Sequence, residues 1–144
     1  MTKKRTVAVV ALVVLTAAAI FAFSACSSGE GAWAEMGVDK DRITGITLVS
    51  GSGTLKRLEG DRLTAFIADF DALTLRKSSE GFPDNGYDYA VRVTSEGEDG
   101  YLEYRLGQQL ILHDGFGGAD AAFYYLDDGY AAAAETVRAY FYAM

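Results

Sequence analysis

The one histidine of the chain, His113, is the residue type best suited to proton transfer near neutral pH. It ends an alternating run from Gln109 that predicts a strand, and we place it on the outward face beside Glu103 and Asp114. A catalytic role would pair it with an orienting carboxylate and a hydroxyl nucleophile such as Ser95 or Tyr101. The sequence has no second imidazole and no Gly-x-Ser-x-Gly motif. We therefore assign no catalytic residue and leave enzymatic activity open.

Carboxylates gather around one glycine turn, where Asp84, Asn85 and Asp88 surround Gly86. Oxygen ligands of this kind suit a hard cation such as calcium. The spacing does not fit an EF-hand loop, in which alternating ligands precede the glycine and a bidentate glutamate follows it. We predict an ordinary turn here, with no metal site and no cofactor.

Nine tyrosines in a small protein exceed what a core requires. A tyrosine combines a large rigid ring with a polar tip, so exposed tyrosines favour contacts with proteins or glycans. The segment from Phe82 to Tyr87 is the best candidate for a recognition loop. The alternative is a turn whose aromatic residues clamp the edge of the sheet. The predicted binding residues are Phe82, Asp84, Asn85, Tyr87 and Tyr101.

The only cysteine, Cys26, closes a distinctive N-terminal segment. Three cations, Lys3, Lys4 and Arg5, precede an apolar run from Val7 to Phe23, and small residues then lead to the cysteine. This order resembles a bacterial lipoprotein signal peptide. The resemblance implies that the sulfur of Cys26 is lipidated and that Cys26 becomes the first residue of the mature protein.

The apolar run is longer than a usual signal core and slightly shorter than the roughly 20 residues of a spanning helix, so an uncleaved anchor and ordinary secretion stay open as alternatives. The polar, glycine-containing stretch after Cys26 predicts a flexible tether. We divide the chain into a signal peptide (1–25), a lipidated cysteine with its tether (26–40) and one domain (41–144).

The charge balance is acidic, with a formal net charge of −7. Removing the leader takes away its three cations and leaves ten basic residues against twenty acidic ones. Nucleic acid is therefore excluded as an expected partner. The same charge would repel an anionic lipid surface, so we expect the domain to stand off the membrane on its tether.

Alternation and helical spacing predict the elements of the domain. In the hairpin from Tyr87 to Leu106, one register sets Val93 opposite Leu102, Val91 opposite Tyr104 and, on the other face, Arg92 opposite Glu103. A three-residue loop would then set Leu112 against Tyr104. The remaining predictions are strands at 43–49, 54–58, 72–77, 109–113 and 121–126, a helix from 60 to 70 with Leu63, Phe66, Ile67 and Phe70 on its apolar face, and a final helix after 129.

Together these elements predict an α+β domain, with a twisted, mostly antiparallel sheet of about six strands and two helices on one face. Tethering and layout are similar to those of small lipoproteins of Gram-positive bacteria. We expect a membrane-tethered, extracytoplasmic binding or interaction module of the cell envelope, with an envelope protein or glycan as its partner. An envelope hydrolase using acidic residues, and an accessory or assembly factor for a partner protein, remain as alternatives.

Overall fold

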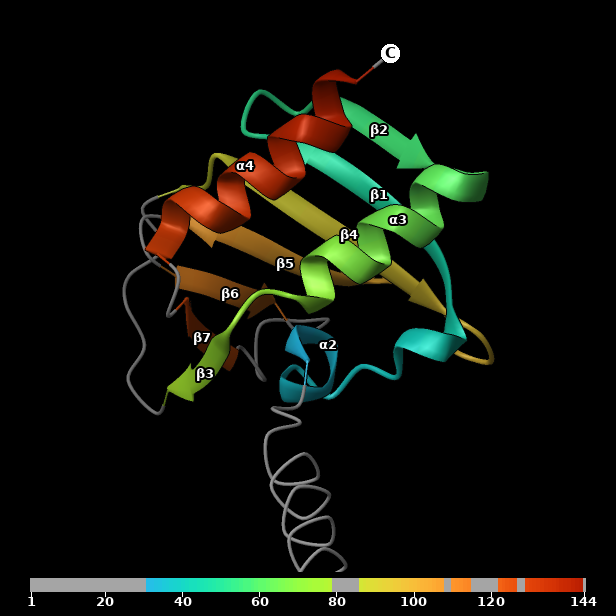
Figure 1. The fold of residues 1–144 in the computed structure, drawn as a ribbon, viewed down its shortest axis with the longest axis horizontal. Helices are drawn as coiled ribbons and strands as arrows, with labels where there is room; N and C mark the ends of the chain where they lie inside the picture. Colours follow the sequence, from blue (N-terminus) through green and yellow to red (C-terminus); the bar gives the residue numbers. More distant parts are fainter. Residues whose placement is uncertain (1–30, 79–85, 108–109, 115–121, 127–128, 144) are drawn as a thin grey trace, which may run out of the picture. The chain divides into compact units, whose positions relative to one another are not determined.

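Seven strands form one antiparallel sheet in the computed structural model, which describes residues 31–78, 86–107, 110–114, 122–126 and 129–143 (Figure 1). The order across the sheet is β2-β1-β4-β5-β6-β7-β3, so both short strands, β2 and β3, lie at its edges. The strands are β1 (Ile43–Ser50), β2 (Leu55–Leu58), β3 (Leu75–Ser78), β4 (Tyr89–Ser95), β5 (Leu102–Gly107), β6 (Leu110–Asp114) and β7 (Ala122–Leu126).

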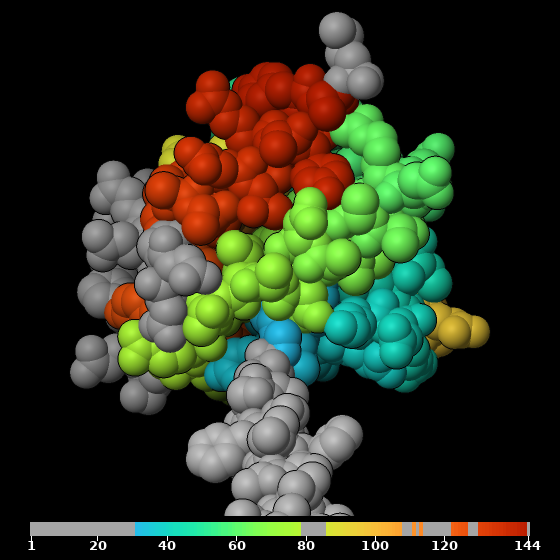
Figure 2. All heavy atoms as spheres, in the orientation of Figure 1, coloured from blue at the N-terminus to red at the C-terminus, as the bar shows by residue number. Residues whose placement is uncertain are grey.

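Two long helices, α3 (Gly60–Asp71) and α4 (Gly129–Tyr142), lie side by side across one face of this sheet. Figure 2 shows their side chains in contact along that face. A short helix, α2 (Ala32–Glu35), packs against α3 and β3, and a 3₁₀ turn, η1 (Lys40–Arg42), leads into β1. The predicted α+β class, antiparallel sheet and one-sided helix layer are confirmed. Among the described residues, no helix is long and apolar enough to cross a bilayer.

The core lies between the helices and the sheet. Phe66 and Phe70, from the predicted apolar face of α3, are fully buried, and the partly buried Leu63 and Ile67 pack against the core. The sheet contributes a layer of buried side chains from its central strands: Ile46, Leu48, Val91, Val93, Tyr104, Leu106 and Ile111.

The register of the β4–β5 hairpin agrees with the prediction. Val93 pairs with Leu102, Val91 with Tyr104, and Arg92 with Glu103. The register is fixed because the alternation places apolar residues on the helix side and a matched ion pair on the other side.

The predicted register of the next strand is wrong by one residue. Gly107 pairs with Leu110 and Tyr104 with His113, so two residues connect β5 to β6 instead of three. A one-residue shift moves every side chain to the opposite face. His113 therefore lies on the helix side, with its ring 5.0 Å from that of Tyr104, and not outward beside Glu103.

Residues 31–40 differ from the flexible tether predicted over 26–40. Trp33 is the largest fully buried side chain of the described residues, and Met36 and Val38 are also buried. The indole Nε1 donates a hydrogen bond of 2.8 Å to the carbonyl of Ile67, and the ring lies 4.6 Å from Phe70. The folded unit consequently begins at Gly31, and Cys26 lies outside the described residues.

The edge strand β3 is partly covered by α2. The backbone amide of Lys77 donates to the carboxylate of Glu35 over 3.2 Å. This bond occupies a backbone donor that an edge strand would otherwise present to another chain.

The carbonyl end of α4 is held by cations from neighbouring elements. Lys56 Nζ on β2 donates to the carbonyls of Phe141 (2.9 Å) and Ala143 (2.7 Å), and Arg62 of α3 donates to Tyr140 (2.6 Å). These donors satisfy carbonyls at the end of the helix that have no partner within it. Their positive charge also interacts favourably with the negative end of the helix dipole.

We expect Lys56→Met to lower the free energy of unfolding by about 1 kcal/mol, because α4 loses this charged cap. Urea unfolding followed by circular dichroism measures the change. The matched control is Arg57→Met, which removes the same charge from an exposed neighbour in a loose 3.9 Å ion pair with Glu59. Equal losses in the two variants would show that the cap contributes nothing specific.

Candidate functional site

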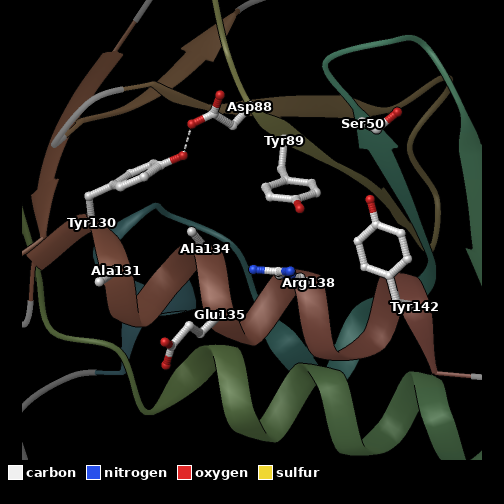
Figure 3. A pocket seen from close by; sticks show the side chains of 9 residues that line it. All are labelled: Ser50, Asp88, Tyr89, Tyr130, Ala131, Ala134, Glu135, Arg138 and Tyr142. Atoms are coloured by element: carbon white, nitrogen blue, oxygen red, sulfur yellow. Dashed lines mark hydrogen bonds between the residues drawn. The ribbon is translucent and has the colours of Figure 1, made fainter.

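A groove of about 390 Å³ opens between α4 and the adjoining ends of β1 and β4 (Figure 3). Three of its lining residues are tyrosines, and three carry a charge. The lining consists of Ser50, Asp88, Tyr89, Tyr130, Ala131, Ala134, Glu135, Arg138 and Tyr142.

Sheet pairing and helical spacing bring this set together. Ser50, the last residue of β1, pairs with Tyr89, the first residue of β4. On α4, Tyr130, Ala134, Arg138 and Tyr142 recur at every fourth position and therefore share one face of the helix. Small alanines between larger side chains leave space above the helix backbone.

A hydrogen bond closes one end of the groove. The Tyr130 hydroxyl donates to the carboxylate of Asp88, which joins the start of α4 to the start of β4 (Figure 3). Burial raises the pKa of Tyr130, and the hydrogen bond to Asp88 raises it further. Tyr130 therefore keeps its proton throughout the neutral range and fixes Asp88 as an acceptor.

The other end of the groove presents two aromatic rings and a cation. In Figure 3, Tyr89 lies above Arg138 and Tyr142 lies to its upper right, and 63% of Tyr142 is exposed. Burial raises the pKa of Tyr89, the neighbouring Tyr142 raises it further, and Arg138 acts in the opposite direction. A ligand in the groove would meet an exposed ring and a charged donor together.

The groove offers polar and charged groups that could bind a ligand. Its described lining supplies carboxylates, a guanidinium and hydroxyls. Within the described ranges, no group of three or more histidine, cysteine, aspartate or glutamate side chains is arranged to hold a metal ion. The predicted neighbourhood for a catalytic His113 is also wrong, because that ring lies beside Tyr104.

Two of the predicted binding residues lie outside the groove, at the face of the sheet away from the helices. The guanidinium of Arg92 is 4.7 Å from the ring centre of Tyr101, and that of Arg105 is 5.5 Å from the ring centre of Tyr87. Tyr87 is half-buried and 39% of Tyr101 is exposed. The other predicted residues, Phe82, Asp84 and Asn85, lie outside the described residues.

A buried carboxylate connects these two aromatic contacts. Glu103 accepts hydrogen bonds from Arg92 Nε (2.6 Å) and Arg105 Nε (2.8 Å). Burial raises the pKa of Glu103, but the two guanidinium groups outweigh it and hold that pKa below its usual value. Tyr87 and Tyr101 thus flank a charge cluster that joins β4 to β5.

Sequence reasoning missed most of the groove. Tyr89 alternates in step with Val91 and Val93, and Tyr130 shares the apolar face of the final helix, so neither pattern points to a ligand site. The available signal was the spacing of Tyr130, Arg138 and Tyr142, which places polar and aromatic groups on one side of the final helix.

Comparison of the chain with protein-family models, with curated proteins and with solved structures finds no match. The class of site therefore follows from its geometry: a solvent-open, tyrosine-lined groove of mixed charge on an α+β domain.

Proposed function

We propose that this chain is a lipid-anchored, extracytoplasmic binding module of the cell envelope, and that its groove binds a glycan. The observation that carries the proposal is the groove lining, in which Tyr89, Tyr130 and Tyr142 surround charged groups. The lipoprotein-like leader ending at Cys26 supports the location. Acyl chains on that sulfur would hold the protein at a membrane, since each buried methylene contributes about 0.8 kcal/mol.

A glycan fits the lining better than other ligand classes. Sugar rings offer apolar C–H faces that stack on tyrosine, and hydroxyls that bond to carboxylates and guanidinium groups. A peptide anchored by an apolar side chain would need an apolar pocket, but among the described residues the only aliphatic ones in the lining are Ala131 and Ala134. A phosphate would meet one cation, Arg138, beside two carboxylates, Asp88 and Glu135.

The test is calorimetric titration of the full chain in detergent with soluble oligosaccharide fragments of peptidoglycan. We expect Tyr142→Ala to weaken binding about tenfold, which corresponds to about 1.4 kcal/mol, because an exposed stacking surface is lost. Asp88→Asn should weaken binding in the same direction, since it replaces a carboxylate acceptor.

Tyr101→Ala is the matched control, because it removes another part-exposed tyrosine on the opposite face of the sheet. It should leave the affinity unchanged. Equal losses of glycan affinity for Tyr142→Ala and Tyr101→Ala would show that the binding site is not the groove. If the full chain binds no glycan but co-purifies with one stoichiometric protein, the glycan proposal fails and an accessory role replaces it.

A further inference from the structure

We infer that the lipid anchor fixes the orientation of this domain, with α2 and η1 facing the membrane surface across the short tether and the groove pointing away from it. The inference rests on the lipidation proposed above. It adds a membrane-facing surface and an outward direction for the ligand site.

The first step is the point where the chain joins the fold. A Cβ atom added at Gly31 would lie 2.1 Å from a carboxylate oxygen of Asp71, so the backbone passes directly against the end of α3. Two residues later, the Trp33 amide donates to Asp71 Oδ1 over 3.3 Å, and its side chain is fully buried. The chain is held in place from Gly31 onward.

The second step is the length of chain left for a tether. Five residue steps separate Cys26 from Gly31. An extended chain covers at most about 3.6 Å per residue, so Gly31 lies no more than about 18 Å from the lipidated cysteine. The polar headgroup region takes up several of those ångströms. The domain therefore has little freedom to rotate away from the bilayer.

The third step is the position of the groove relative to this junction. Lys40 of η1 bonds to Asp71 over 2.6 Å, so η1 and α2 meet at the same residue of α3. From η1, β1 runs from Ile43 to Ser50, and Ser50 lines the groove. Seven steps of about 3.3 Å separate the two ends of β1 by about 23 Å. In Figure 1, α2 accordingly lies on the side of the folded unit opposite the last turn of α4.

The acidic side chains near η1 favour a domain held near the membrane by its tether over one that adheres directly to the lipid surface. Asp39 and Asp41 are exposed there. Of the two cations of η1, Lys40 is paired with Asp71, and Arg42 is exposed and donates to the carbonyl of Glu96. Acidic groups are repelled by anionic lipid over about 8–10 Å at physiological salt. This repulsion would keep the short tether extended. The orientation of the domain would then be set by the length of the tether and not by contacts with lipid.

The experiment compares two introduced cysteines in the full lipidated chain, reconstituted into phosphatidylcholine vesicles that contain a fluorescent acceptor lipid. A donor dye at Asp41→Cys reports the membrane end, and one at Leu55→Cys reports the far end of β2; both positions are exposed. We expect energy transfer to the bilayer to be about twofold or more greater at position 41, given the length of β1.

Three controls separate the outcomes. The wild-type chain should take up no dye, because its only cysteine carries acyl chains; dye uptake would instead overturn the proposed anchoring. Inserting about 20 Gly/Ser residues after Ser28 gives a tether of about 25 Å root-mean-square length and should largely remove the difference between the two positions. Raising the salt to about 1 M should leave it intact. Equal transfer at positions 41 and 55, in a chain whose wild type takes no dye, would overturn the orientation.

Discussion

Trp33→Ala is expected to lower the free energy of unfolding by about 3–5 kcal/mol, a large share of the roughly 5–15 kcal/mol that holds a domain together. The indole is fully buried against Phe70, and its truncation would leave a cavity between α2 and α3. The carbonyl of Ile67 would also lose its donor. Guanidinium unfolding followed by circular dichroism measures the change without relying on the lost fluorophore.

Two variants bracket this result. Trp33→Phe keeps a ring beside Phe70 and loses the indole N–H, so its cost should be smaller than that of Trp33→Ala. Leu55→Ala truncates an aliphatic side chain that is 55% exposed, and should change stability by no more than about 0.5 kcal/mol. If Trp33→Ala is as stable as Leu55→Ala, residues 31–38 are not part of the core.

The second large effect is loss of stability at alkaline pH. Burial raises the pKa of several tyrosines above 10.0, and that of Tyr140 reaches about 12, with Asp69 contributing a hydrogen bond. Above pH 10.0 the unfolded chain loses these protons while the folded chain keeps them, so the free energy of unfolding falls as pH rises. The contribution is fully present below pH 10.0. The affected residues are Tyr89, Tyr104, Tyr124, Tyr130 and Tyr140.

Each unit of difference between the folded and unfolded pKa of a buried tyrosine corresponds to about 1.4 kcal/mol. Solvent screens the part-exposed rings, so the buried Tyr104 carries most of the loss. Denaturant unfolding at a series of pH values, with tyrosinate absorbance recorded in parallel, measures it. We expect a steep fall from about pH 10 upward, with ionisation of the buried tyrosines coinciding with unfolding.

Tyr104 should dominate this effect. Its side chain is 1% exposed, and within the described ranges its hydroxyl has no hydrogen-bond partner. Tyr104→Phe is therefore expected to be as stable as the wild type at neutral pH, or more stable by about 1 kcal/mol, and to show a shallower alkaline fall. Tyr101→Phe, at a site 39% exposed, is the control. An unchanged alkaline profile in Tyr104→Phe would contradict this account.

The sequence pattern predicted strand register correctly where the residues on both faces of a strand restrict the pairing. Between β4 and β5, Val91 and Tyr104 select the core side, and Arg92 with Glu103 selects the other, so only one register satisfies both. In β6, Leu110, Ile111 and Leu112 are consecutive apolar residues, and a shift of one still buries an aliphatic side chain. The position of His113 was therefore not determined by pattern alone.

Features that depend on distant contacts could not be predicted. The four residues of α2 are too few to show a helical period, and Trp33 is buried only because α3 lies above it. The groove likewise requires the end of β1 to meet α4, which no local pattern encodes. Composition did indicate a surplus of tyrosine. Tyr87 and Tyr101, however, lie against the guanidinium groups of Arg105 and Arg92 and not in the groove.

The bond between the Lys77 amide and Glu35 bears on how copies of this protein would behave when crowded together. On the proposed lipid anchor, copies would diffuse in two dimensions and collide often, and an open strand at a sheet margin would let them join into ribbons. At this margin β3 spans only four residues, bears the cations Arg76 and Lys77, and has one donor already taken by Glu35. Such a margin resists strand addition. Copies of the protein are thus not expected to join through β3.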